Sequence, residues 1–165
     1  MKKKTRRGRT YDMRPVPTTW NGVDYKSRLE ARWAIVFWLS NVPTTYEAVE
    51  SHRGKDVYVP DFAVPRPKSP GDYSNFIEIK PTKPTTKEIS ALSTLWYQTG
   101  TPCWFFCGSY PQHSTIWRIT ESGKLELCYK DGPTETTLNT LIGRSRTRSP
   151  INLRNALHIA GYYKF

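Results

Sequence analysis

The chain has 165 residues, of which 37% are hydrophobic and 13% aromatic, and its formal net charge at pH 7 is +11. This length and composition are those of a folded domain rather than a disordered chain. No apolar run approaches the roughly 20 residues with which a helix spans a bilayer, so we expect a soluble protein without a membrane partner. A charge this positive favours a polyanion, and nucleic acid is the expected partner.

Two clusters of basic residues carry much of this charge. Six of the first nine residues are Lys or Arg, and three Arg follow in the segment GRSRTR at 143–148. The alternatives are a solvated basic surface or one that meets an anionic membrane. Nucleic acid is favoured because there are two such clusters. The expected contacts to nucleic acid are Lys2, Lys3, Lys4, Arg6, Arg7, Arg9, Arg144, Arg146 and Arg148.

Features of the termini and the cysteines bear on the compartment. No apolar segment of signal-peptide type follows the basic N-terminus, so secretion is not expected. Cys103, Cys107 and Cys128 are an odd number of cysteines, which argues against a disulfide framework. We therefore expect a cytoplasmic protein associated with DNA.

The first half of the chain is expected to form one helix and three strands. Residues 1–19 are interpreted as a basic, flexible arm and residues 20–165 as a single domain. After NGVDY, which is expected to turn into the helix, residues 27–40 have good helix formers, no Pro or Gly, and apolar residues on most faces. Three strands follow, the first two joined by the turn SHRGK, at 44–50, 56–64 and 74–81.

The second half is expected to add a helix, a strand, a hairpin and a last helix. Thr86 is the expected cap of a helix at 87–98, and Gly100 is expected to end it. The aromatic, uncharged segment 101–110 is typical of a strand covered on both faces. A hairpin then pairs 115–120 with 124–130, and a short helix is expected within 151–163.

This order of elements predicts an α/β fold. Helix, three strands, helix and strand (αβββαβ) would form a central mixed sheet flanked by helices, followed by the C-terminal hairpin and helix. The first three strands would be antiparallel, and the second helix would make a right-handed crossover between parallel strands.

Two acids occur on strands that are otherwise apolar. In FIEIK, the period of two places Ile77 and Ile79 on one face and Glu78 and Lys80 on the other. Because the proline before Asp61 cannot donate to a sheet, we expect a bulge or an edge there, which frees Asp61 to turn towards the next strand. Ionised acids in an apolar setting need a partner, and a metal ion would supply one.

These residues resemble a known motif. PD at 60–61 and EIK at 78–80, on successive strands, are similar to the PD-(D/E)XK motif of restriction-endonuclease-like nucleases, whose common core has the same element order. Glu30, in SRLEARWA, stands where many members carry an acid on the first helix, and Ser-x-x-Glu there resembles the transposon end-cleaving and phage-type branches. The resemblance covers about residues 20–80 and, more weakly, the chain up to residue 107, so the core motifs fall within 25–107.

The resemblance implies a metal-dependent DNA endonuclease that hydrolyses phosphodiester bonds. Asp61 and Glu78 would bind Mg²⁺, for which Mn²⁺ can substitute, together with the main-chain carbonyl of Ile79. Lys80 would position or activate the attacking water, and Glu30 would complete the catalytic set. No phosphate-binding glycine loop is present, so no nucleotide cofactor is implied. A homodimer or a targeting partner protein would help to select the DNA.

Other interpretations remain open. PD and ExK are each common by chance, and an ordinary turn and an ion pair between Glu78 and Lys80 would explain them. One alternative is a DNA-binding protein without catalysis on the same scaffold, and another is a structure-specific (junction-type) or RNA-directed nuclease. The segment LWYQTG departs from the Gln-x-x-x-Tyr of the exonuclease branch, so processive exonuclease activity is not expected.

Several further residues have competing interpretations. Ser27 and Glu30 have the spacing of a capping box, which alone could explain that glutamate. Glu47 could assist metal binding, although an outward-facing acid is the favoured interpretation. His52 and His158 have no adjacent nucleophile. A zinc site is disfavoured against core thiols, because the first two candidates are four residues apart on one strand; its members would be Cys103, Cys107, Cys128 and His113.

Overall fold

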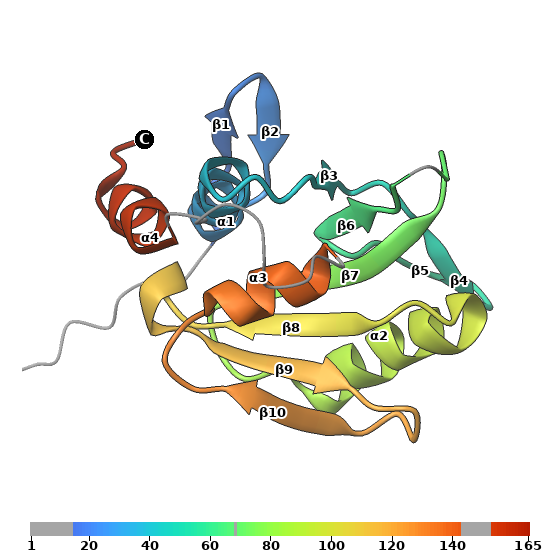
Figure 1. Cartoon of the computed structure of the whole chain (residues 1–165). Coiled ribbons are helices and arrows are strands. Elements are labelled where there is room, and N and C mark those ends of the chain that lie inside the picture. The colour runs from blue at the N-terminus through green and yellow to red at the C-terminus, as the bar shows by residue number, and fades with distance from the viewer. Residues whose placement is uncertain (1–14, 68, 143–152) are drawn as a thin grey trace, which may run out of the picture.

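A six-stranded mixed sheet of order β10-β9-β8-β7-β6-β3 forms the centre of the computed structural model, which describes residues 15–67, 69–142 and 153–165 (Figure 1). The parallel pair is β7 with β8, and the other neighbours are antiparallel. The α/β class is therefore confirmed. The strands are β3 (Thr45–Tyr46), β6 (Phe62–Pro65), β7 (Tyr73–Lys80), β8 (Cys103–Cys107), β9 (Thr115–Ile119) and β10 (Leu125–Tyr129).

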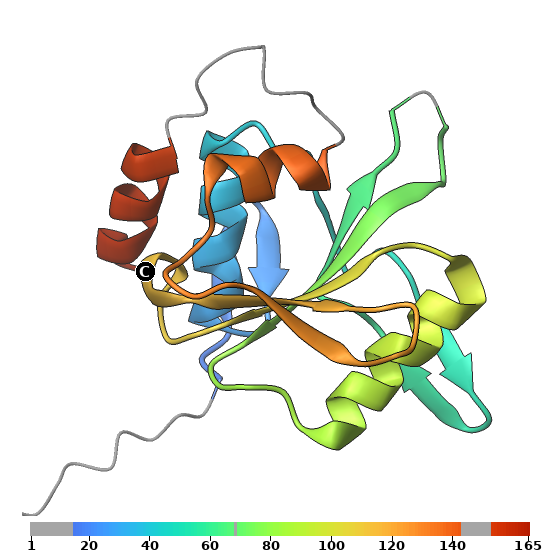
Figure 2. The ribbon, with the colours of Figure 1, turned by 60° about the horizontal axis from the view of Figure 1, so that its bottom comes forward.

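Helices cover both faces of this sheet. On one face, Trp33 and Phe37 of α1 pack against Phe62 and Phe106. On the other, Leu92 of α2 belongs to a second apolar cluster that contains the remaining side chains of β8. Figure 2 shows α2 on the side of the sheet opposite α1 and α3. The helices are α1 (Arg28–Leu39), α2 (Thr86–Thr99), α3 (Glu135–Leu141), α4 (Leu153–Tyr162) and the short 3₁₀ helix η1 (Pro111–His113).

The crossover through α2 explains why β7 and β8 are parallel. The chain leaves the end of β7, runs back along the sheet as α2, and enters β8 in the same direction. Gly100, with φ 67°, occupies the left-handed conformation that ends α2, as predicted. The expected cap at Thr86 is wrong by one residue, because the Thr85 side chain accepts the N–H of Glu88 in a capping box.

The segment before α1 corrects one prediction. NGVDY does not turn into the helix but belongs to a hairpin of β1 (Thr18–Trp20) and β2 (Val23–Tyr25). Asn21 and Gly22, with φ of 49° and 76°, form its two-residue turn. Asn-Gly adopts two positive φ angles at little cost, which is why it joins strands so often. The helix itself is confirmed and begins after Ser27.

The predicted strand at 56–64 is broken. β3 pairs with β6, but SHRGK is part of a separate hairpin of β4 (Ser51–Arg53) and β5 (Asp56–Tyr58). The chain leaves the strand conformation before Asp61, where Pro60 offers no N–H to a ladder. A bulge or an edge was expected at Pro60; the structure has a break between β5 and β6 there, and the irregularity in the β6–β7 register is at Val64 and Pro65.

The C-terminal elements are largely as expected. The β9–β10 hairpin and the last helix are confirmed, whereas α3 was not foreseen. Asn75 of β7 ties α3 to the sheet, because its amide donates to the Leu141 carbonyl at 2.6 Å and accepts the Trp104 indole N–H at 2.7 Å. The nine basic residues expected to contact nucleic acid lie outside the described residues. No helix in the described ranges combines the length and the apolar character needed to cross a membrane.

Candidate active site

The predicted acids meet at the end of the sheet where β7 stops and where α1 and α2 begin, on the left of Figure 1. The β6–β7 ladder starts at the Phe62–Ile77 pair, so Ile79 lies beyond it. Its N–H donates instead to Oδ2 of Asp61 at 2.7 Å, and the Asp61 N–H donates to Oε2 of Glu78 at 3.3 Å. The side chain of Asp61 has thus turned towards β7, as the sequence predicted.

The carbonyl of Ile79 faces the same region. On a strand, the N–H and C=O of one residue point to the same neighbour. Because the Ile79 N–H is directed at Asp61, its carbonyl is directed to that side as well. A main-chain oxygen and two carboxylates therefore approach each other here.

Glu78 and Lys80 lie side by side on β7. Nζ of Lys80 is 2.7 Å from Oε1 of Glu78 and 3.2 Å from Oε1 of Glu88, in the first turn of α2. The hydroxyl of Tyr58 donates to the other oxygen of Glu78 at 2.8 Å. Glu78 is 4% exposed and Asp61 8%, so both carboxylates are taken from water.

Burial and mutual repulsion act on the pKa values of these groups. Burial, then the charge of Glu78, raise the pKa of Asp61 well above its ordinary value. Burial also raises the pKa of Glu78, although Lys80 and Tyr58 act in the opposite direction. Burial alone would lower the pKa of Lys80, but the neighbouring acids, Glu78 first, raise it. Lys80 thus stays charged, and the two acids favour either a proton or a further cation.

Glu30 lies at the start of α1, next to this pair. It is 8% exposed. Its carboxylate accepts the Ser27 hydroxyl at 2.6 Å, the Lys26 N–H at 3.1 Å and the hydroxyl of Tyr46. Its charge contributes to the raised pKa of Asp61. The residue is therefore both a helix cap and a third acid near the site.

Replacing Glu30 with glutamine separates these two roles. A glutamine oxygen can still accept the Lys26 N–H, and its amide can donate to the hydroxyl oxygens of Ser27 or Tyr46. We expect Glu30→Gln to keep its melting temperature within about 2 °C. For the nuclease activity that the resemblance implies, it should lose roughly 10- to 100-fold in Mg²⁺-dependent DNA nicking, as for residues that orient a metal's ligands. Gel-based nicking and thermal melting measure both effects.

Ser27→Ala is the matched control for the cap. It should cost about 1 kcal/mol of unfolding free energy and, because it removes one hydrogen bond to Glu30 but keeps its charge, lower the nicking rate far less than Glu30→Gln does. Full activity in Glu30→Gln would restrict Glu30 to the helix cap.

Sequence reasoning missed the groups that hold the acids. Tyr58 donates to the carboxylate of Glu78 and Tyr46 to that of Glu30. Glu88 forms an ion pair with Lys80. A tyrosine three residues before Asp61 was a usable signal, because a buried carboxylate requires donors. Glu47 follows β3 with φ 48°. Its N–H donates to the Asp61 carbonyl at 3.0 Å, and its carboxylate forms an ion pair with Lys26.

The cysteines and histidines do not form a second centre. Cys103 and Cys107 are buried in the apolar cluster under α2, and burial raises the pKa of Cys107 to about 12. All three cysteines are free, and His52 pairs with Glu50 at 3.6 Å. Within residues 15–67, 69–142 and 153–165, no three or more His, Cys, Asp and Glu side chains are placed to hold a metal ion together.

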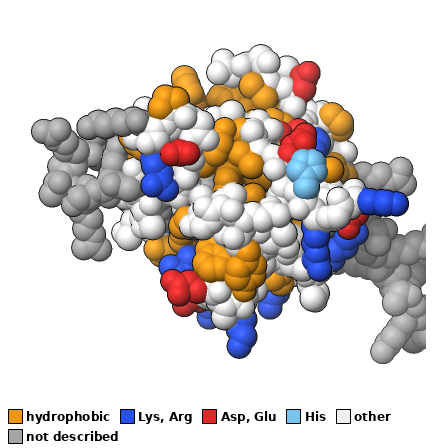
Figure 3. Space-filling view, turned by 90° about the vertical axis from the view of Figure 1, so that its right-hand side faces the viewer, with side chains coloured by type: hydrophobic (Ala, Val, Ile, Leu, Met, Phe, Trp, Pro, Cys, Tyr) orange, Lys and Arg blue, Asp and Glu red, His pale blue; other side chains and the backbone are white. Residues whose placement is uncertain are grey.

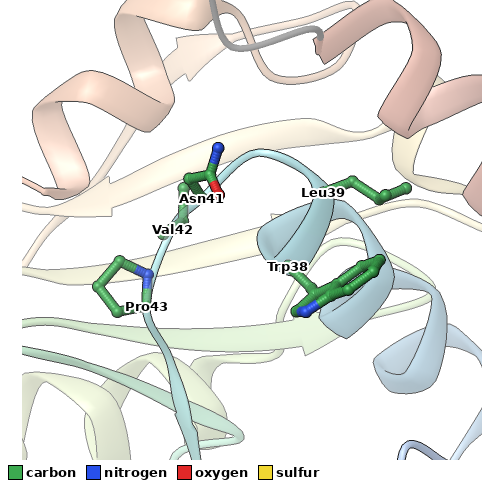
Figure 4. Close-up of a pocket in the computed structure, with 5 residues that line it drawn as sticks. All are labelled: Trp38, Leu39, Asn41, Val42 and Pro43. Atoms are coloured by element: carbon green, nitrogen blue, oxygen red, sulfur yellow. The ribbon is translucent and has the colours of Figure 1, made fainter. Parts of the chain in front are cut away.

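Two other regions of the described surface differ from this site. A hollow of about 600 Å³ at the end of α1 is lined by Trp38, Leu39, Asn41, Val42 and Pro43, none of which is titratable (Figure 4). It is eight residues, about 12 Å along the helix, from Glu30. Figure 3 shows the side of the molecule on the right of Figure 1, where acidic, basic and hydrophobic side chains are mixed. Among the described residues, buried acids meet a lysine at the end of β7.

Comparison of the chain with protein-family models, with curated proteins and with solved structures found no match.

Proposed function

We propose that this protein is a Mg²⁺-dependent DNA endonuclease built on a restriction-endonuclease-like core. One observation carries the proposal: Asp61, just before β6, and Glu78, on the neighbouring β7, are buried together with Lys80 beside them. Burying two acids together disfavours their ionised forms and lowers the stability of the fold. Such a cost is typical of functional sites.

The donor set fits a hard divalent cation. Two carboxylates and the Ile79 carbonyl offer oxygen ligands. Burial raises the pKa of both acids, and for Asp61 the charges of Glu78 and Glu30 raise it further, so a cation at this position would be favoured. A bound Mg²⁺ supplies Lewis-acid activation of water and neutralisation of phosphate charge. The ligands proposed here are Asp61, Glu78 and the carbonyl of Ile79.

The surrounding residues hold these groups in place. The Ile79 N–H fixes the Asp61 carboxylate, and Tyr58 fixes that of Glu78. Glu88 forms a second ion pair with Lys80. Lys80 remains an ammonium, so its role is to orient the attacking water or to stabilise charge on the phosphate, rather than to remove a proton.

A plasmid assay tests the proposal. Supercoiled DNA should be nicked in Mg²⁺ or Mn²⁺, and EDTA should stop the reaction. Linear, single-stranded and branched DNA and an RNA duplex, each tested in the same buffer, define the substrate, and preference for a branched molecule would indicate a junction-type nuclease. If no member of this panel is cleaved in either metal, the endonuclease proposal fails.

A second candidate is a DNA-binding protein that keeps this scaffold without catalysis. It is favoured by the contacts of Lys80, whose ammonium lies between Glu78 and Glu88, and by the lack of a third side chain grouped with the two acids for a metal in the described ranges. It predicts salt-dependent DNA binding with no nicking in Mg²⁺ or Mn²⁺.

A further inference from the structure

Two basic side chains near the candidate site are stacked on aromatic rings. The guanidinium carbon of Arg32, on α1, is 4.7 Å from the centre of the Tyr110 ring. Nζ of Lys83, which precedes α2, is 4.8 Å from that of Trp117. In the described part of the chain, neither cation forms an ion pair with an acid. A ring orients a cation without neutralising its charge.

The stack of Arg32 on Tyr110 has an unused donor. Arg32 Nε is buried and has no hydrogen-bond partner among the described residues. A guanidinium has five N–H donors in a planar fork that suits phosphate. Because Nε is buried, the terminal NH2 groups of Arg32, which the ring holds in place, are the donors that an anion would meet.

Both stacks lie towards β8 and β9 from the acids, but at opposite faces of the sheet, because Arg32 is on α1 whereas Trp117 packs in the apolar cluster under α2. The Gly108 N–H donates to the Lys80 carbonyl at 2.8 Å, and Tyr110 is two residues further on. Lys83 is three residues after Lys80, and its partner Trp117 is on β9. Lys80 therefore has the stacks on its β8–β9 side, whereas Asp61 is on its β6 side.

The opposite side carries more negative charge. Lys26 on that side forms an ion pair with Glu47. Glu30 and Asp61 add negative charge on that side. A polyanion is thus attracted over β8–β9 and repelled on the β6 side, except where a bound cation compensates the acids.

We propose that the stacks of Arg32 on Tyr110 and Lys83 on Trp117 bind the phosphate backbone of DNA on one side of the bond that is cleaved. The strand crosses the sheet end over β8 and β9, passes Lys80, and presents one phosphate to Asp61 and Glu78. The placement of that one phosphate at Asp61 and Glu78 rests on the proposed function, whereas DNA binding by the two stacks is tested without cleavage.

Salt-dependent binding of a fluorescent DNA duplex in EDTA tests this surface. The variants are Lys83→Gln, Arg32→Gln and the double variant, in the full chain. Removing one cation that binds a phosphate should lower the slope of log affinity against log salt by about 0.9, so the slope of the double variant should fall by about 1.8. Lys124→Gln is the matched control, because it removes one charge from the exposed β9–β10 turn at the far end of the sheet and should keep the slope.

The outcomes separate this surface from catalysis. A slope in Lys83→Gln that equals that of Lys124→Gln overturns the surface, and this result does not depend on Arg32, whose replacement could disturb packing. If the slope falls as expected but wild-type protein does not nick DNA in Mg²⁺ or Mn²⁺, the surface stands and the endonuclease proposal fails. If wild-type protein nicks DNA while all slopes are equal, catalysis stands and the surface is wrong.

Discussion

Asp61→Asn and Glu78→Gln are each expected to lower Mg²⁺-dependent nicking of plasmid DNA by a factor of about 10³. Each removes one charged ligand of the proposed metal while keeping the shape of the side chain. This factor corresponds to a loss of about 4 kcal/mol of transition-state stabilisation. A bound metal ion supplies stabilisation of this order. An asparagine oxygen can still accept the Ile79 N–H, so the sheet end should stay intact.

The same nicking assay tests a third variant and a control variant. Lys80→Ala should also abolish nicking, while DNA binding in EDTA survives in all three variants because the stacked cations remain. Glu126→Gln removes an acid from an exposed ion pair with Arg118 on the β9–β10 hairpin, and its rate should stay within twofold of wild type. Nicking by purified Asp61→Asn at the wild-type rate would refute the assignment.

The convergence of Asp61, Glu78 and Lys80 could be predicted because local rules determine it. A strand alternates its faces, so Glu78 and Lys80 must be neighbours on the face opposite Ile77 and Ile79. Proline interrupts a ladder, so the residue after it has no fixed place in the strand. Both rules act over a few residues, and the structure follows them.

The partners of these residues could not be predicted in the same way. Tyr46 reaches Glu30 across 16 positions, and Tyr58 reaches Glu78 across 20. Such contacts depend on strand order and register, which one sequence does not specify when several short strands compete. Glu88 was predictable in one role and not in the other. Its capping of α2 is a local contact, whereas its ion pair with Lys80 depends on the tertiary fold.

The errors in the fold have local causes. Asn21-Gly22 was an available hairpin signal, but flanking strands of three residues each are too short to show a clear alternation. β3 has two residues and is held by its pairing with β6 rather than by its own pattern. α3, in contrast, has seven residues and a Thr134 cap, and its polar composition resembles that of a loop.

The raised pKa values make the stability of the folded protein depend on pH, and this dependence can be measured without any catalytic activity. For an acid whose folded-state pKa is above its unfolded value, the folded protein binds the proton more tightly. The corresponding stability is complete below the ordinary pKa, 3.8 for Asp61 and 4.5 for Glu78, and is lost as the pH rises through the folded-state values. Without metal, the melting temperature of wild type relative to Asp61→Asn should therefore fall as the pH is raised from 4 to 8.

Divalent metal should reverse that loss. At pH 8, where the acids release their protons most readily, Mg²⁺ or Mn²⁺ at 100 times its dissociation constant should add about 2.7 kcal/mol of stability. For a chain of this size, this amounts to a rise in melting temperature of roughly 5 to 10 °C. At pH 4 the rise should be much smaller, because protons compete with the metal for the same oxygens.

Variants identify where the metal acts in this experiment. Asp61→Asn and Glu78→Gln should lose most of the rise at pH 8, whereas Glu126→Gln should show the wild-type rise. An equal rise in all four proteins would mean that the metal binds elsewhere, and the ligand set proposed here would be wrong. Melting requires no substrate. A rise in melting temperature confined to proteins with both acids would therefore support the metal site even if DNA is bound and not cleaved. The experiment thus distinguishes a metal-binding scaffold from a protein in which Lys80 alone compensates the two carboxylates.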